Sequence, residues 1–419
     1  MKKLVLLLLN CCFLYSVYAQ TIDASGKPST AIDYNRLKRI DTLVNSYIAK
    51  GWLTGVVTLV VKDNQLVQYK GYGYQDADTK KPMPNDALFR LASQTKAIVS
   101  AGVMTLWEEG KFTLDEPIAD FIPAFRHPKV LDTYNATDTT YTTVPAKREI
   151  TFRDLLTHTG GIDYAVIGSP KMVAIYAKAG IPVGLGNVDM DLKERMAALA
   201  TLPLVSQPGE KWNYSLSIDI LGALVEIISG TNLEDYLMQK IFIPLGMKDM
   251  FFNVPASKAS RLASVYTEDS LGHIIKLDAR RGFNPDYPLE KKHYFSGGAG
   301  LTGTAFDYAV FLQMMLNKGK YNGVQVLAPR TVELMTSGQL DFNFNGTDNF
   351  GLGFGITSEK SGNRSPRNAG SFSWGGYFGT TYWADPKAKL VGLIMTQQVP
   401  NSHGDLAAKV EQLMYQSLK

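Results

Sequence analysis

Hydrophobic strand patterns lie at both ends of the chain. Residues 54–74 (TGVVTLVVKDNQLVQYKGYGY) place β-branched residues on both sides of Asp63-Asn64, a pattern typical of a hairpin that opens an antiparallel sheet. Strand character returns at 351–356, 372–383 and 390–397, and residues 404–418 close the chain with a helical period. We therefore expect the two ends of the chain to build one sheet together.

Helical periodicity dominates the middle of the chain, from about residue 93 to residue 288. Apolar stripes predict helices over 97–109, 152–156, 192–201, 218–229 and 233–241. Residues 129–147, rich in Thr and Asp, are expected to form a surface excursion without chemistry of its own.

This order of elements predicts an α+β fold. We expect an antiparallel sheet flanked by helices and built from both chain ends, with an inserted, mainly helical domain and a site at the seam between the two. The expected sheet domain comprises residues 20–90 and 295–419, and the expected helical domain comprises residues 91–294.

The composition is that of an ordinary globular protein, with 419 residues of which 45% are hydrophobic. Residues 1–19 begin with two lysines, continue with an apolar run and end in Val17-Tyr18-Ala19, which predicts a signal peptide and a periplasmic or secreted protein. Both cysteines, Cys11 and Cys12, fall in this segment, so the mature chain would contain no disulfide and no reactive thiol. Lipoprotein anchoring at Cys11 is the less favoured alternative, because Asn10 suits lipidation poorly.

Several function classes find no support in the sequence. The net charge of +4 is too small to indicate binding to nucleic acid or to an anionic membrane. The five histidines are scattered without paired spacing, so we predict no metal site and no cofactor. The chain also lacks the G-x-S-x-G elbow, the phosphate-binding loop and the dinucleotide fingerprint. We expect no membrane span after removal of the signal peptide.

Ser93-Gln94-Thr95-Lys96 is the segment that points to chemistry. Residues three apart on a helix share one face, and backbone N–H groups at a helix start favour a negative charge developing beside them. A lysine amine surrounded by apolar residues can act as a general base, so Ser93 is a candidate nucleophile and Lys96 its base. Serine is also a common helix N-cap, and this motif alone does not decide between the two roles.

Two later segments add candidate catalytic groups. A Pro-Gly turn brings Tyr214 to the start of a predicted helix, where its phenol can relay a proton with a nearby lysine. Trp374-Gly375-Gly376 precedes Tyr377, and glycines in a strand often mark the close approach of a ligand to a backbone N–H. Taken singly, the tyrosine is equally consistent with packing and the glycines with a bulge.

Taken in order, the motifs of this chain resemble those of the serine β-lactamase and penicillin-binding protein superfamily. Ser-x-x-Lys at 93–96 is joined by LLTHTGG at 155–161, by YSxxxDILG at 214–222, by PLGM at 244–247 and by WGG with WxDP at 374–386. The resemblance runs from about residue 35 to the C-terminus. It is greatest to the class C lineage and to the family VIII carboxylesterases.

The resemblance implies a role for each matched residue. Ser93 would be acylated, Lys96 would activate it, and Tyr214 would pass a proton to the leaving group and then activate water. The backbone N–H groups of Ser93 and Tyr377, beside the substrate-binding segment Trp374-Gly375-Gly376, would form the oxyanion hole. The histidine of LLTHTGG, His158, would belong to the scaffold.

Two departures from the class C pattern favour esters over β-lactams. Leu216 stands where the Tyr-x-Asn motif has its asparagine, and Trp374-Gly375-Gly376 replaces the Lys-Thr-Gly strand that supplies a cation. We therefore expect a serine hydrolase that cleaves small esters through a Ser93 acyl-enzyme. A β-lactamase or D-amino acid/peptidoglycan peptidase, with a cell-wall peptide as partner, remains open. So does an acylable sensor or binding protein with poor turnover.

Overall fold

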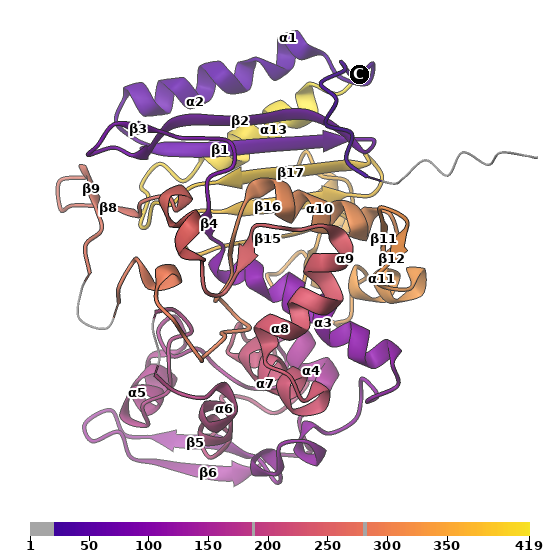
Figure 1. Ribbon diagram of the computed structural model, residues 1–419. Helices are drawn as coiled ribbons and strands as arrows, with labels where there is room; N and C mark the ends of the chain where they lie inside the picture. The colour runs from indigo at the N-terminus through magenta and orange to yellow at the C-terminus, as the bar shows by residue number, and fades with distance from the viewer. Residues whose placement is uncertain (1–20, 187–188, 280–282) are drawn as a thin grey trace, which may run out of the picture.

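The computed structural model describes residues 21–186, 189–279 and 283–419 (Figure 1). The predicted signal peptide at 1–19 and the alternative lipidation site Cys11 lie outside the described residues. Within the described ranges, no helix has the length and apolar character needed to cross a membrane.

One antiparallel sheet of eight strands joins the two ends of the chain, in the order β13-β14-β15-β16-β17-β1-β2-β3. Its strands are β1 (Gly55–Lys62), β2 (Gln65–Asp76), β3 (Lys81–Pro82), β13 (Asn349–Phe350), β14 (Gly355–Ile356), β15 (Phe372–Gly375), β16 (Thr381–Asp385) and β17 (Leu390–Met395). At the centre, β1 pairs with β17, with Val57 opposite Met395 and Lys62 opposite Leu390. The predicted sheet from both chain ends is confirmed. The domain boundaries at residues 90 and 294 stay a prediction.

The predicted hairpin at Asp63-Asn64 is also confirmed. These two residues connect β1 to β2 with φ values of 51° and 61°, the left-handed conformation that a two-residue hairpin turn requires. Asparagine and aspartate tolerate this conformation better than most residues, which is why the turn was readable from the sequence.

Two predicted strands differ from the structure. Residues 372–383 form two strands instead of one, because a turn over 376–380 separates β15 from β16: Gly376 N–H donates to Thr380 O at 2.8 Å, and Gly379 has a φ of 85°. In the segment 351–356 only the last two residues form a strand, β14, since Gly351 N–H instead closes a loop by donating to Phe354 O at 2.8 Å. In both segments glycine permits a turn where the apolar pattern alone predicts an extended chain.

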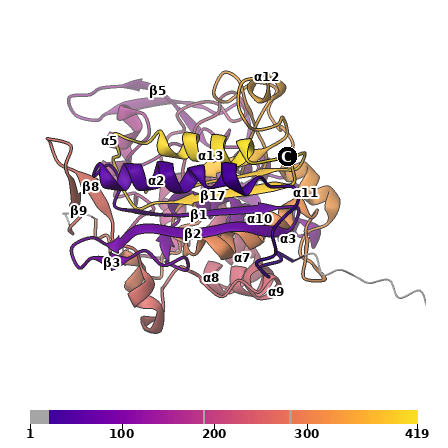
Figure 2. The ribbon, with the colours of Figure 1, turned by 90° about the horizontal axis from the view of Figure 1, so that it is seen from above.

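Helices cover both faces of the sheet. The helices outside the inserted region are α1 (Tyr34–Leu37), α2 (Arg39–Ala49), α10 (Ala305–Leu316), α11 (Pro329–Met335), α12 (Glu359–Gly362) and α13 (Leu406–Gln416). Figure 2 shows α2 and α13 side by side across one face. Alternate residues of β1 divide between the layers, with Val56 and Val60 packed toward α2 and α13 and Val57 and Leu59 in the main core on the other side.

The middle of the chain is mainly helical, as predicted. It contains α3 (Thr95–Glu108), α4 (Phe152–Leu156), α5 (Pro170–Lys178), α6 (Leu192–Ala200), α7 (Ser217–Ser229), α8 (Leu233–Leu237) and α9 (Ile243–Leu245), with a π-helical turn (Met238–Phe242) between the last two. Short strands within this region are β5 (Lys129–Tyr134), β6 (Tyr141–Pro145), β7 (Met250–Phe251), β8 (Tyr266–Glu268) and β9 (Ile274–Lys276). Before and after it lie β4 (Phe89–Arg90), β10 (Thr302–Gly303), β11 (Lys320–Tyr321) and β12 (Val324–Gln325). The expected surface excursion at 129–147 is the β5–β6 hairpin.

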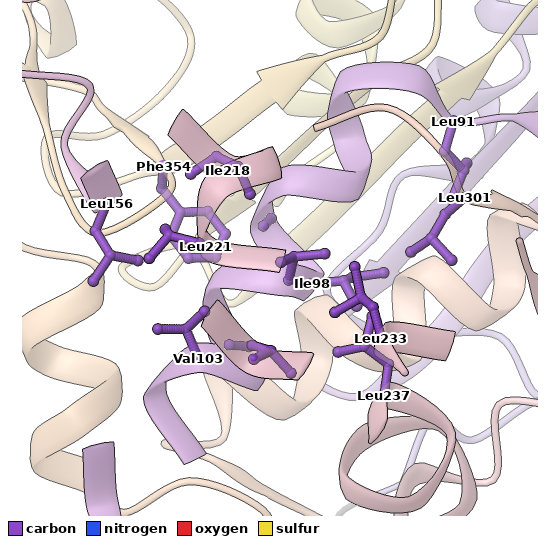
Figure 3. Packing of buried hydrophobic residues seen from close by; sticks show 14 of the residues in the cluster. Leu91, Ile98, Val103, Leu156, Ile218, Leu221, Leu233, Leu237, Leu301 and Phe354 are labelled. Atoms are coloured by element: carbon purple, nitrogen blue, oxygen red, sulfur yellow. The ribbon is translucent and has the colours of Figure 1, made fainter. Parts of the chain in front are cut away.

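Helix α3 lies at the centre of the molecule, between the sheet layer and the other helices (Figure 1). Every residue from Thr95 to Leu106 is buried. Figure 3 shows side chains of α3 packed among those of α7 and α8, namely Ile98, Val103, Ile218, Leu221, Leu233 and Leu237. A helix packed on all sides is a rigid support for any functional group on its first turn.

Gly392→Ala is expected to destabilise the sheet. Gly392 of β17 pairs with Trp383 of β16, and a Cβ on Gly392 would collide with the fully buried indole. We expect the free energy of unfolding, measured by urea denaturation, to fall by about 1–3 kcal/mol. Gly404→Ala is the control, because its Cβ would meet only Asn401 O at 3.5 Å. Equal stability of the two variants would show that the packing around Trp383 is not as tight as described.

Candidate active site

Ser93 lies on a tight strand-to-helix turn. Strand β4 is fixed by β10, with Leu91 N–H donating to Leu301 O at 2.9 Å just beyond it. Ala92 then adopts a φ of 45°, which is uncommon for a residue with a side chain, and begins the 3-10 helix Ala92–Gln94 that runs into α3. Ser93 is half-buried, whereas every other residue from 91 to 100 is buried. The turn therefore presents the serine hydroxyl at the surface of a packed core.

The structure brings Lys96 to Ser93. The two atoms Lys96 Nζ and Ser93 Oγ are 3.4 Å apart, and Nζ also donates to Gly298 O at 2.8 Å. Lys96 is only 2% exposed, so its amine is removed from bulk water. A buried amine that touches a half-buried hydroxyl has the arrangement needed for proton transfer from serine.

The Tyr214 ring lies over the amine of Lys96. Tyr214 lies in the loop before α7, which is tied down by hydrogen bonds from Gly209 N–H to Thr159 O and from Asn213 N–H to His158 O, both at 2.8 Å. Lys96 Nζ is 4.5 Å from the centre of the Tyr214 ring and 5.4 Å from that of Tyr164.

His158 contacts the loop that carries Tyr214. Its φ of 58° turns the chain after α4, and its Nδ1 is 3.0 Å from Ser215 Oγ. Its ring centre is 5.1 Å from that of Tyr214. Burial, and secondarily the charge of Lys96, hold the pKa of His158 well below its usual range. The imidazole is therefore neutral and packs beside Tyr214 without adding a second positive charge to the site.

The segment Trp374-Gly375-Gly376 lies against the turn that carries Ser93. A Cβ on Gly376 would collide with Leu91 O, two residues before Ser93. Gly376 and Tyr377 belong to the turn between β15 and β16, and the Tyr377 side chain is 53% exposed. The Ser93 N–H belongs to the first turn of a helix, where backbone donors have no partner within the helix. The backbones of Ser93 and Tyr377 are thus on adjacent segments.

Aromatic rings form one wall of the site. Trp374 Nε1 donates to Tyr214 OH at 3.4 Å. The cluster around this hydrogen bond consists of Trp212, Tyr214, Phe344, Phe350 and Trp374, with neighbouring ring centres 4.8–6.3 Å apart.

Arg367, a cation near strand β15, points to the face of the sheet opposite the site. It donates to Ser373 Oγ at 2.6 Å and forms an ion pair with Glu411 of α13, on the opposite face of the sheet from Trp374. Successive strand residues point to opposite faces, so the Ser373 side chain leads away from the site. Strand β15 thus places the Trp374 indole at the site, whereas the Arg367 guanidinium binds Glu411 on the opposite face of the sheet.

Sequence reasoning missed Asp219 as a member of the site. It is the third residue of α7, is fully buried, and accepts a hydrogen bond from Ser296 Oγ at 2.6 Å. Burial raises the pKa of Asp219, while the Ser296 hydrogen bond and the charge of Lys96 act in the opposite direction. The available signal was a carboxylate between Ile218 and Ile220 on a mainly apolar helix, because such groups are rarely buried without a partner.

Comparison with known protein families identifies the family to which this chain belongs. The model of the family named Beta-lactamase matches residues 40–414. The chain belongs to the beta-lactamase family. The resemblance inferred from its motifs is thereby confirmed.

Proteins similar to this chain differ in the activity that their names give. Esterase EstB of Burkholderia gladioli is 30% identical over 376 residues, which cover 85% of this chain and 89% of EstB. The N-acetylmuramyl-L-alanine amidase of Bacillus subtilis is 27% identical over 393 residues, covering 87% of this chain and 81% of the amidase. The solved structure of EstCE1, described as a hydrolase with promiscuous acyltransferase activity, is 26% identical, covers 91% of this chain and 99% of its own, and has a TM-score of 0.79.

His158→Asn is expected to change how stability depends on pH. The folded protein keeps His158 neutral, whereas an unfolded chain protonates histidine near pH 6.5, so the unfolded state binds the extra proton below that pH. This component makes the wild type lose up to about 1.4 kcal/mol per pH unit as the pH falls below about 6.5. The variant should be less stable at neutral pH by about 1–3 kcal/mol, through loss of the Ser215 contact, and should show a shallower acid decline.

The measurement is urea unfolding between about pH 7.5 and pH 5. His127→Asn is the matched control, because His127 also has a positive φ, of 54°, while its side chain is 89% exposed. An unchanged acid slope in His158→Asn would contradict a neutral, buried His158.

Proposed function

We propose that this protein is an exported carboxylesterase that cleaves small esters through an acyl-enzyme on Ser93. The observation that carries the proposal is the buried Lys96 amine, 3.4 Å from the Ser93 hydroxyl and beneath the Tyr214 ring. Export is inferred from the signal-peptide pattern at residues 1–19. The esterase activity of the similar EstB supports the proposal.

In the acylation step, the Ser93 O–H bond breaks and its proton passes to Lys96. Ser93 Oγ forms a bond to the ester carbonyl carbon, and the resulting oxyanion is stabilised by the backbone N–H groups of Ser93 and Tyr377. The tetrahedral intermediate collapses when the C–O bond to the alcohol breaks. The alkoxide oxygen takes the proton through Tyr214, and the alcohol leaves.

In the deacylation step, water attacks the carbonyl carbon of the acyl-enzyme. Tyr214, backed by Lys96, accepts a proton from this water, and the same two backbone N–H groups stabilise the second oxyanion. The bond to Ser93 Oγ then breaks, the proton taken from water passes by way of Tyr214 and Lys96 to the serine oxygen, and the carboxylic acid is released. The balance is one ester and one water consumed, and one acid and one alcohol formed.

The walls of the site support an uncharged, apolar acyl group. Trp374 stands where a class C enzyme has its cation, and Arg367 is engaged by Glu411 on the opposite face. Aromatic side chains bind apolar groups over a large area but offer no counter-charge to a substrate carboxylate. A neutral ester fits this site better than the anionic β-lactam of a penicillin.

A peptidase or amidase acting on cell-wall peptides is the second candidate. It is supported by the likeness to the Bacillus subtilis amidase and by the predicted export, which would place the protein beside the cell wall. The Ser93 and Lys96 geometry serves amides as well as esters, so substrate tests must separate the two.

The enzyme is expected to prefer an ester to its matched amide. We predict that p-nitrophenyl butyrate is hydrolysed with a kcat/KM at least about 100-fold higher than that of the butyryl p-nitroanilide or of a penicillin. Ser93→Ala should abolish all turnover while circular dichroism shows an unchanged fold. Comparable or faster turnover of the amide or the penicillin would replace the esterase by a peptidase or a lactamase. A stoichiometric burst without steady turnover would indicate a sensor.

Tyr214→Phe is expected to lower kcat/KM for the ester by about two to four orders of magnitude, because the phenol that relays the proton is lost. The ring, its packing against Trp374 and its position over Lys96 are retained. Tyr141→Phe in the exposed strand β6 is the control and should leave the rate unchanged. A Tyr214→Phe variant with wild-type kinetics would remove the tyrosine from the mechanism.

A further inference from the structure

A buried carboxylate lies behind the lysine. Asp219 of α7 is 0% exposed. Its Oδ1 accepts hydrogen bonds from Ser296 Oγ at 2.6 Å and from Tyr294 OH at 3.4 Å. Among the described residues, Oδ2 meets no donor at full hydrogen-bond geometry, although the backbone of Gly298 beside it helps to lower the pKa of the carboxyl. A buried carboxylate with so few donors on one oxygen is costly, so a nearby positive charge would stabilise it.

Gly298 separates this carboxylate from Lys96. Its carbonyl oxygen accepts the hydrogen bond from Lys96 Nζ at 2.8 Å. A Cβ on Gly298 would collide with Asp219 Oδ2 and would lie 3.5 Å from Lys96 Nζ. The amine and the carboxylate therefore approach a single residue that has no side chain to hold them apart.

The other groups around this pair are neutral. His158 lies on the α4 side of Lys96, and burial and the lysine charge keep its pKa low. Tyr164 and Tyr294 have pKa values raised well above the usual range, mainly by burial, and stay protonated. The charge of Arg195 on α6 lowers the pKa of Tyr294 slightly, against the larger effect of burial. Asp219 is the group among these that can supply a negative charge to Lys96.

We propose that Asp219 is the counter-ion of Lys96 and stabilises the ammonium that forms when Ser93 gives up its proton. The inference rests on the proposed Ser93 acyl-enzyme function and assigns Asp219 as a positioning residue that acts through Lys96. In this step the Ser93 O–H bond breaks and an N–H bond forms on Lys96, with no proton released to solvent. The two charges interact strongly because both are shielded from water.

The electrostatics of Asp219 agree with this role. Lys96 lowers the pKa of Asp219 against the effect of burial. The same Coulomb attraction acts on the ammonium that forms in the acylation step, because the carboxylate and the amine both lie beside Gly298.

The test is the pH dependence of Ser93 labelling in Asp219→Asn. Asparagine keeps the shape of the side chain and an oxygen that can accept from Ser296 Oγ, but it removes the charge. The second-order rate of inactivation by a fluorophosphonate is measured from about pH 5 to pH 10, with the labelled residue mapped by mass spectrometry. We expect the midpoint of the acidic limb to move about one unit or more to lower pH, and the plateau rate to fall at least about tenfold.

Two further variants keep the result interpretable. Asp307→Asn is the matched control, because Asp307 is a buried carboxyl on α10 whose pKa burial raises to about 6 and which accepts from Asp249 N–H at 2.6 Å. It should reproduce the wild-type profile. Ser296→Ala removes a hydrogen bond that stabilises the Asp219 carboxylate. The midpoint of the acidic limb of its pH profile should therefore move to lower pH, by a smaller amount than in Asp219→Asn. This variant carries the test if Asp219→Asn does not fold.

The outcomes separate the two claims. An Asp219→Asn profile with the wild-type midpoint, however slow the reaction, would overturn the counter-ion role and leave Asp219 a structural residue. A shift toward higher pH, or an equal shift in Asp307→Asn, would overturn it as well. Absence of Ser93 labelling in the wild type would instead refute the proposed function, and with it the role built on that function.

Discussion

Burial of the Lys96 amine beside a half-exposed serine is the constraint on which the rest of the site depends. An amine that is 2% exposed loses its water shell, and the protein must replace that shell with its own groups. Gly298 supplies a carbonyl oxygen, Tyr214 and Tyr164 supply ring faces, and Asp219 supplies a counter-charge. These groups come from three separate parts of the chain, namely the α4–α5 loop (Tyr164), the start of α7 (Tyr214 and Asp219) and the segment before β10 (Gly298), so the site exists only when these parts are assembled.

The architecture explains how Ser93 stays partly exposed while Lys96 is buried. Helix α3 is buried from Thr95 to Leu106, which fixes Lys96, while the strained turn at Ala92 places Ser93 at the surface of the core. The sheet side contributes its part through Gly376, whose missing side chain lets the β15–β16 turn lie against Leu91. A rigid helix from one layer and a close strand from the other thus meet at Ser93. That the active site lies at a seam between two domains stays a prediction.

The sequence predicted correctly those features that depend on interactions between residues close together in the chain. The Asp63-Asn64 turn, the helix 152–156 and the shared face of Ser93 and Lys96 depend on residues close in sequence, and the structure places them as expected. The split of 372–383 into two strands was missed, because Gly376 follows an extended path in one context and a turn in another. The roles of Asp219 and Arg367 could not be predicted from the sequence, because each depends on contacts with a distant segment. Asp219 contacts Ser296 and Gly298, and Arg367 pairs with Glu411 of α13.

The central claim is that Ser93 carries the acyl group during turnover. The most direct measurement is time-resolved mass spectrometry of the mature protein mixed with p-nitrophenyl butyrate, with peptide mapping of any adduct and Ser93→Ala in parallel. We expect a butyryl adduct on the peptide that contains Ser93, formed and lost at rates that account for product release, and no adduct in the variant. Product release without an adduct, or an adduct on another residue that also forms in Ser93→Ala, would contradict the account.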